Sequence, residues 1–145
     1  MIHPKAAQYC VQAQDDGHDI ALDQGIIMIS MENIEESIPS YMDMTMKNVN
    51  RAFGTILIHE VTKIYNMMGL PTNMFHVKLT TNECQSLGEF LCSSVTVELE
   101  GDNNDYILKG FLGCKVMDYP PRRSQFDPKE NIIIGNVALY GETSG

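Results

Sequence analysis

The spacing of hydrophobic residues over the first third of the chain predicts helices followed by a strand. Residues 19–37 carry apolar side chains in a loose helical repeat that Gly25 interrupts, so we expect one or two short helices that end near Pro39. From Ser40 to Lys47 apolar and polar positions alternate, which is the period of a half-buried strand. Its inner side would consist of three methionines, Met42, Met44 and Met46.

An amphipathic helix is predicted next. Asn50 is the expected N-cap, and Gly69 and Pro71 supply the stop, because glycine adopts the left-handed conformation that closes a helix and proline cannot continue it. His59 and Glu60 are neighbours that would point about 100° apart, so we interpret them as solvated surface and not as an acid–base pair. The apolar face, at spacings of 4, 4, 3 and 4, consists of Phe53, Leu57, Val61, Ile64 and Met68.

From residue 75 onward, short β-branched runs recur at a nearly constant interval. When Val77, Val97, Val116 and Ile133 are taken as equivalent, the steps are 20, 19 and 17 residues. A period near 20 without a helical pattern is typical of a solenoid, in which each coil buries its apolar side on its neighbours. The runs are residues 76–79, 95–99, 115–119 and 132–134, and a second set of apolar runs lies at 87–91, 106–109 and 137–140.

Two runs per coil, separated by glycine-bearing turns, predict a fold that is mainly β with an α/β lead-in. We expect a truncated right-handed single-stranded β-helix over residues 73–145, preceded by a helical and strand lead-in over residues 1–72. A sandwich of hairpins is the alternative. Residues 120–129 interrupt the repeat with three prolines, so we expect a surface loop whose Arg122 and Arg123 are solvated or dock an acidic partner.

Composition excludes several classes of function. The 145 residues include 19 acidic and 10 basic side chains, a formal net charge of −9, which gives no electrostatic footprint for nucleic acid. The longest apolar run, residues 26–29, is far short of the roughly 20 residues that cross a bilayer, and the N-terminus has no apolar signal region. We therefore expect an intracellular, soluble chain with no membrane partner.

The sequence predicts no catalytic, cofactor-binding or metal-binding residue. Its cysteines are 74, 8 and 22 positions apart, which matches no zinc or cluster motif, and no histidine is placed beside one as a base. The acidic stretch at residues 102–105 lacks the completion of a calcium loop, so we interpret it as a hydrogen-bonded corner. The cysteines are Cys10, Cys84, Cys92 and Cys114, and the histidines are His3, His18, His59 and His76.

Several consecutive stretches closely resemble the C-terminal glycine-rich (GXGXG) β-helix domain of glutamate synthase, in its NADH-dependent, plant-like form. The resemblance covers nearly the whole chain, and the motifs follow one another in the right order. In the glycine-rich part they are residues 84–91, 98–106, 119–121 and 132–141. In the lead-in they are residues 5–10, 21–23, 48–52 and 59–63.

This resemblance implies a non-catalytic part of a large oxidoreductase that makes glutamate from glutamine and 2-oxoglutarate. The family's flavin mononucleotide, iron–sulfur cluster and NADH or FAD sites lie in other regions, so no cofactor is expected on this chain. The expected partners are glutamate synthase chains, or a second copy bound through the open end of the β-helix. The alternative is an oxidoreductase component that contributes to glutamate biosynthesis only within a larger assembly. The family resemblance implies a plastid, but no transit peptide is visible, which favours the cytoplasm.

The chain departs from the family where the turns are tightest. Five usual glycine positions carry other residues, and Glu89 and Glu142 replace small alanines. Each change is expected to cost on the order of 1 kcal/mol through strain or overpacking. The chain also stops at Gly145, where the family's β-helix continues, so we expect an exposed, adhesive surface at residues 132–140. The replaced glycine positions are Thr81, Cys84, Ser94, Leu108 and Cys114.

Overall fold

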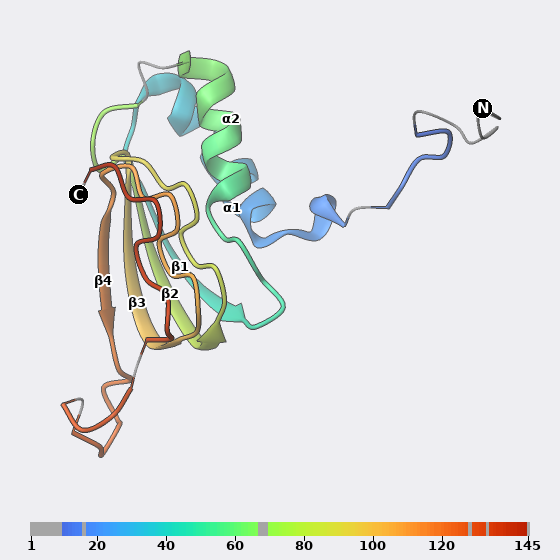
Figure 1. Cartoon of the computed structure of the whole chain (residues 1–145). Coiled ribbons are helices and arrows are strands. Elements are labelled where there is room, and N and C mark those ends of the chain that lie inside the picture. Colours follow the sequence, from blue (N-terminus) through green and yellow to red (C-terminus); the bar gives the residue numbers. More distant parts are fainter. Residues whose placement is uncertain (1–9, 16, 67–69, 128, 133, 145) are drawn as a thin grey trace, which may run out of the picture.

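A four-stranded parallel sheet in the order β1-β2-β3-β4 forms the centre of the molecule (Figure 1). The computed structural model describes residues 10–15, 17–66, 70–127, 129–132 and 134–144, without the side chains of residues 81–84. Strand order follows chain order, so each strand pairs with the strand that precedes it in the sequence. The strands are β1 (Ser40–Lys47), β2 (Phe75–Cys84), β3 (Val95–Asn103) and β4 (Lys115–Tyr119).

The strands stack in register because equivalent positions carry similar side chains. Val77 pairs with Val97, and Val97 pairs with Val116, so branched residues from three strands form one row on the inner face. Of these three, Val77 and Val97 are fully buried. The bounds predicted for β1 and β4 are confirmed, and in β1 the methionine positions are more buried than the polar residues between them.

Two helices pack together at the end of the sheet where β1 lies (Figure 1). A short 3-10 turn, η1 (His18–Ile20), leads into α1 (Leu22–Glu36), which confirms the helix predicted ahead of Pro39. Helix α1 closes at Ser37, whose φ of 56° lies in the left-handed region. Helix α2 (Thr55–Tyr65) buries Leu57 and Val61.

The start predicted for the second helix is wrong. Helix α2 begins at Thr55, and its N-cap is Gly54 with a φ of 98°. Asn50 instead closes the turn after β1, since its Oδ1 accepts a hydrogen bond from the Lys47 N–H at 2.9 Å. Of the predicted apolar face, the first three residues are buried and Ile64 is 40% exposed. Met68 and Gly69 lie outside the described residues.

Three turns lie one beside the next over a face of the sheet (Figure 1), and backbone hydrogen bonds join them. They are residues 85–92, 105–113 and 136–144. The Leu108 N–H donates to Leu87 at 2.8 Å, and the Leu139 N–H donates to Ile107 at 3.0 Å. Equivalent residues of successive turns therefore stack, although the third turn follows the second by 31 positions, from Ile107 to Ala138, because the surface loop after β4 lies between them.

These turns correct the prediction of a second strand in each coil. The segments 87–91, 106–109 and 137–140 contain turns and isolated bridges, but no strand. Every second residue is left-handed, with positive φ at positions 86, 88 and 90 and again at 106, 108 and 110. A backbone that alternates in this way cannot form an extended ladder. The predicted run at 132–134 is not a strand at Ile132 or Ile134, and Ile133 lies outside the described residues.

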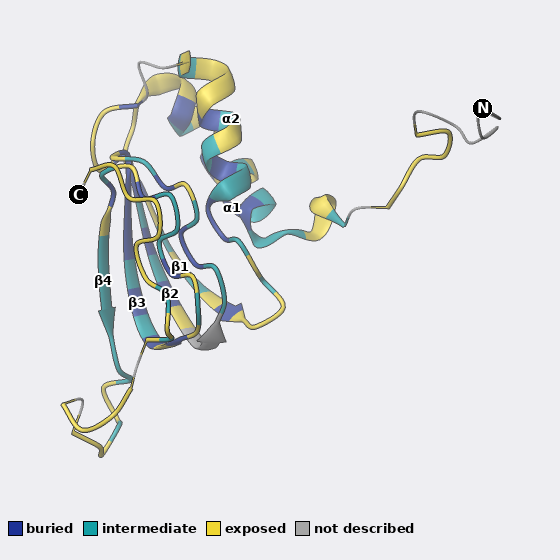
Figure 2. Cartoon of the chain, in the orientation of Figure 1, coloured by how far each residue is buried: buried dark blue, intermediate teal, exposed yellow. Residues whose placement is uncertain are grey.

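One apolar core joins the lead-in to the repeats (Figure 2). It includes Ile26 and Ile34 of α1 together with Leu79 and Leu99 of the sheet, all at most 1% exposed. The predicted surface loop at residues 120–127 extends beyond β4 and is mostly exposed (Figure 2). Among the described residues no helix has the length and apolar character needed to cross a bilayer.

The left-handed positions give a first testable prediction. Leu139 has a φ of 57° and is 41% exposed, so its backbone is strained while its side chain buries little. Because a left-handed L-residue costs about 1 kcal/mol and glycine pays almost none of it, Leu139→Gly should be about 1 kcal/mol more stable than Leu139→Ala. Urea unfolding of the two variants measures the difference. Equal stabilities, or a more stable alanine variant, would contradict the assigned conformation.

Of the five glycine replacements, the structure places Leu108 alone among the described residues in the left-handed region, with a φ of 58°. Ser94 and Cys114 have no positive φ, so backbone strain is not the cost there. Both are buried, which leaves tight packing as the effect of their side chains. The structure does not describe the side chains of Thr81 and Cys84.

Candidate functional site

The structure describes the thiol groups of three of the four cysteines. Cys10, Cys92 and Cys114 are free, and they are exposed, half-buried and buried respectively. Burial, with a smaller contribution from Cys92, raises the pKa of the Cys114 thiol to about 12, so this thiol stays protonated at neutral pH. Among the described residues no three His, Cys, Asp or Glu side chains gather as a metal site.

The acidic corner at residues 102–105 is hydrogen-bonded to the backbone, as predicted from the sequence. The Asn104 Oδ1 accepts from the Asp105 N–H at 2.9 Å. The Asp105 Oδ1 accepts from the Asn136 N–H at 2.8 Å and so ties one turn to the next. Gly135 packs directly on this corner, because a Cβ at that residue would lie 2.4 Å from the Asp105 Oδ1. These contacts give the corner a structural role.

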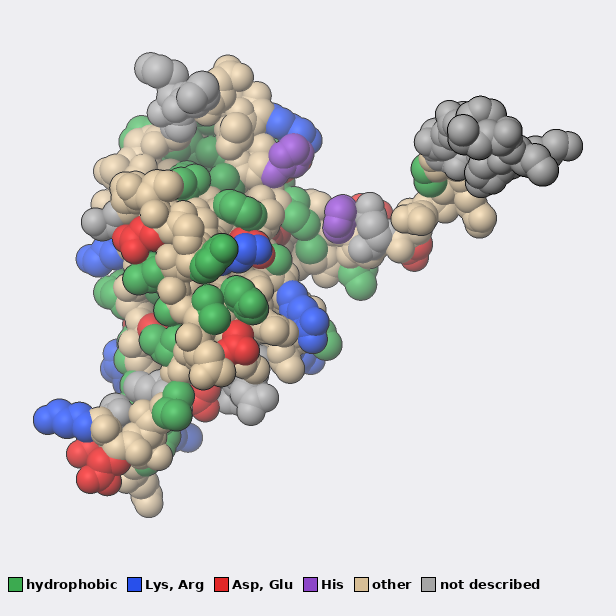
Figure 3. All heavy atoms as spheres, viewed as in Figure 1, with side chains coloured by type: hydrophobic (Ala, Val, Ile, Leu, Met, Phe, Trp, Pro, Cys, Tyr) green, Lys and Arg blue, Asp and Glu red, His purple; other side chains and the backbone are tan. Residues whose placement is uncertain are grey.

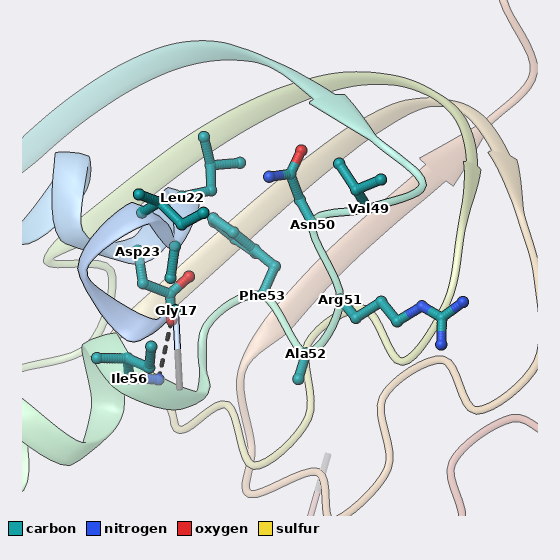
Figure 4. A pocket seen from close by; sticks show the side chains of 11 residues that line it. Gly17, Leu22, Asp23, Val49, Asn50, Arg51, Ala52, Phe53 and Ile56 are labelled. Carbon is teal, nitrogen blue, oxygen red and sulfur yellow. Dashed lines mark hydrogen bonds between the residues drawn. The ribbon is translucent and has the colours of Figure 1, made fainter. Parts of the chain in front are cut away.

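Asp23 is the buried carboxylate that sequence reasoning missed. It is 2% exposed and lies in the first turn of α1, yet it caps the N-terminus of α2 (Figure 4). Its oxygens accept hydrogen bonds from the N–H groups of Gly54, Ile56 and Leu57 at 2.9 to 3.1 Å. Burial raises the pKa of the Asp23 carboxyl, and the three backbone donors oppose that rise. The carboxylate oxygens of Asp23 are therefore occupied by hydrogen bonds that stabilise the fold.

A cavity of about 430 Å³ lies beside this cap. Figure 4 shows that the Arg51 side chain extends away from Asp23, so the two charges do not converge on a common point. A small-molecule site normally combines an apolar lining with a few convergent polar groups. The second feature is missing from this cavity within the described residues, and its lining includes Gly17, Ile20, Leu22, Val49 and Phe53.

The outer face of the sheet carries a ladder of polar side chains. Glu98 accepts a hydrogen bond from the Tyr119 hydroxyl, and it lies 3.8 Å from His76 and 3.9 Å from Lys78. The Tyr119 hydrogen bond is the main cause that lowers the pKa of Glu98, although burial opposes it. Because these side chains remain partly exposed, their ion pairs contribute little to stability. The cluster contains no serine or cysteine that could serve as an activated nucleophile.

Aromatic side chains form the most exposed apolar feature of the stacked turns, and Figure 3 shows hydrophobic side chains gathered over them. Phe90, Tyr106 and Tyr140 are 46%, 42% and 66% exposed. Phe90 covers Gly110, since a Cβ there would lie 2.6 Å from the ring. Lys109 lies near both tyrosines and pairs with Glu89 at 2.7 Å. We call these three rings the aromatic surface.

Comparison with known proteins places this architecture in a class. Residues 23–145 match the GXGXG motif family. The chain is 44% identical to glutamate synthase [NADH] of Schizosaccharomyces pombe over 99% of its length, and 34% identical to glutamate synthase [NADH] of Saccharomyces cerevisiae over 100%. It is also 34% identical to the glutamate synthase [NADPH] large chain of Bacillus subtilis over 100% of its length. These alignments cover 7%, 7% and 10% of the three relatives.

The chain belongs to the GXGXG motif family. Its resemblance to the glutamate synthases is confirmed, and the two yeast relatives support the NADH-dependent form. Because the chain spans a tenth or less of these relatives, the similarity concerns one segment of each of them.

Proposed function

We propose that this chain is a structural, non-catalytic module of a glutamate synthase, serving glutamate biosynthesis within a larger enzyme. The observation that supports this most is that the buried carboxylate and the buried thiol of the chain already have structural roles. Among the described carboxylates the most buried, Asp23, is engaged by three backbone N–H groups, and the buried Cys114 thiol is held protonated. Groups that are used in this way maintain a scaffold and are not available to a substrate.

We further propose that the sheet and the stacked turns are two faces of a β-helix. The support is that the strands pair in register and that the turns between them are joined by their own backbone hydrogen bonds. Both faces would bury their apolar side chains on a shared core, as in a solenoid. The flavin mononucleotide, iron–sulfur and NADH or FAD chemistry would then belong to other regions of the enzyme.

The proposed partner is another part of a glutamate synthase. The aromatic surface supports this choice, because exposed aromatic rings are enriched where proteins bind one another. Self-association through the end of the stack is the other expected mode. A second candidate function, an active oxidoreductase component, is favoured by the 44% identity to a glutamate synthase [NADH].

A retention experiment tests the partner. The tagged chain is expected to retain a purified full-length NADH-dependent glutamate synthase. Phe90→Ala and Tyr140→Ala should each weaken retention about tenfold, the effect of losing an aromatic anchor. Tyr41→Ala is the matched control, because Tyr41 is 76% exposed on the first strand and lies outside the aromatic surface. Equal retention of all variants, or no retention of the parent chain, would contradict the proposed surface.

An activity assay separates the two candidate functions. The chain alone should form no glutamate from glutamine, 2-oxoglutarate and NADH. Turnover by the purified chain, lost after mutation of one of its own side chains, would favour the active component. Failure of the retention experiment leaves this assay unaffected, so each proposal can be rejected separately.

A further inference from the structure

Strand β4 places a carboxyl group beside a pair of buried leucines of the sheet. Asp118 pairs in register with Leu99, and Leu99 pairs with Leu79, so the three side chains share the inner face. Leu79 and Leu99 are fully buried. An ionised carboxylate in such a row is costly unless it is paired. Asp118 forms no ion pair with a cation among the described residues.

One carboxyl oxygen of Asp118 accepts a hydrogen bond and the other has no partner in the described part of the chain. The Asn103 Nδ2 donates to the Asp118 Oδ2 at 2.6 Å. The other oxygen of each group, the Asn103 Oδ1 and the Asp118 Oδ1, is buried and has no hydrogen-bond partner in the structure. Asn103 is 8% exposed. Two acceptors are therefore left in adjoining side chains, and a buried acceptor without a donor is destabilising.

A single proton satisfies both oxygens. A carboxylic acid and a primary amide are complementary: the amide N–H donates to one carboxyl oxygen, and the acid O–H donates back to the amide oxygen. We propose that Asp118 is protonated in the folded chain and that Asn103 and Asp118 form a proton-operated latch. The latch fastens β4 to the end of β3.

The electrostatic surroundings agree with a neutral acid. Burial is the main cause that raises the pKa of Asp118, the Asn103 hydrogen bond opposes it, and the negative charge of Asp102 raises it further. The other charged groups of the adjacent strand, Glu98 and Glu100, alternate with Leu99 and so project from the opposite face of the sheet. Lys115, on β4 itself, is exposed and three positions away.

The sign of the pH effect follows from linkage. The folded chain holds the Asp118 proton more tightly than the unfolded chain, whose aspartate has the ordinary pKa of 3.8. Between that value and the raised one, the folded state binds more protons, so stability falls as pH rises. The latch is closed at low pH and weakened at high pH.

The test compares the full chain with Asp118→Asn by urea unfolding across a pH series. Asparagine mimics the neutral acid and can make both hydrogen bonds at every pH. The variant should therefore unfold at a higher urea concentration than the parent at high pH, and the difference should shrink toward zero as the pH falls to the ordinary aspartate pKa. Asp43→Asn is the matched control, since Asp43 is exposed on β1 and should show no such trend.

Infrared spectroscopy supplies a second readout. Above the ordinary aspartate pKa the folded parent should show a C=O stretch of a protonated carboxylic acid that is stronger than in Asp118→Asn, because Asp23, whose pKa is also raised, is common to both chains. A stability difference that does not change with pH would overturn the proposal, as would a band of equal strength in the two chains. Calcium chloride is added in a third arm. If calcium stabilises the parent but not Asp118→Asn, the two oxygens bind a cation and not a proton, which also overturns the proposal.

Discussion

Replacing Asp23 with alanine is expected to lower the free energy of unfolding by about 3 kcal/mol, because it removes a helix cap and leaves buried N–H groups without an acceptor. The affected donors are the N–H groups of Gly54, Ile56 and Leu57, at the start of α2. Helix α2 should then be held less firmly against α1, because the hydrogen bond from the Tyr65 hydroxyl to the Ile34 carbonyl remains as a polar contact between them. Urea unfolding followed by circular dichroism measures the loss.

Asp23→Asn is the matched control for this change. Asparagine keeps one oxygen where the Asp23 Oδ2 accepts from Ile56 and Leu57, and it loses the charge whose burial is costly. Its stability should lie much closer to that of the parent chain. If alanine and asparagine are equally destabilising, the negative charge or the second acceptor oxygen is what matters, because asparagine keeps the shape of the side chain.

Replacing Leu99 with alanine is expected to cost about 2 to 5 kcal/mol, the range observed for buried leucines. Leu99 is fully buried, with 0% of its surface exposed, and it lies between Leu79 of β2 and Asp118 of β4. Shortening the side chain leaves a cavity in the middle of the sheet, which the neighbouring strands cannot fill without losing their register. The midpoint of urea unfolding is the measurement.

Thr45→Ala is the control for the Leu99 change, because Thr45 is an exposed residue of β1 and its substitution removes little buried area. Such surface changes are normally within about 0.5 kcal/mol. A loss at Leu99 no larger than the loss at Thr45 would mean that the inner row does not hold the sheet together.

Local sequence patterns were sufficient for the strands that alternate. Residues 40–47 place methionines on one face by period alone, and the predicted bounds of β1 equal the observed ones. The branched runs at 76–79, 95–99 and 115–119 all lie within observed strands, because branched residues fit a pleated, half-buried surface. Their common step also indicated that successive strands are neighbours.

Tertiary contacts explain the errors. The N-terminus of α2 is capped by Asp23, a residue 31 positions before Gly54, so no local cap was present to mark the helix start. Asn50 is a residue type that often caps helices, but its side chain closes the turn after β1. The apolar runs at 87–91 and 106–109 have the composition of strands, yet their alternating left-handed backbone follows from stacking on the neighbouring turns.

The absence of a catalytic site stays a prediction, and two of the side chains on which it rests, His3 and Cys84, lie outside the described part of the chain. The interpretation of the corner at 102–105 is confirmed at Asn104 and Asp105, because the side chains of asparagine and aspartate readily bond to nearby backbone. The pair Asn103 and Asp118 could not be found in this way. Its two members lie on different strands, 15 positions apart, and only the register of β3 and β4 brings them together.

The agreement of strand order with chain order bears on how this chain acquires its structure during synthesis. Each strand hydrogen-bonds to the one made just before it, so every partner is already available when the next strand leaves the ribosome. No strand has to wait for a distant segment, which keeps the closed loops short and their entropic cost low. The sheet can therefore grow from β1 toward β4 as translation proceeds.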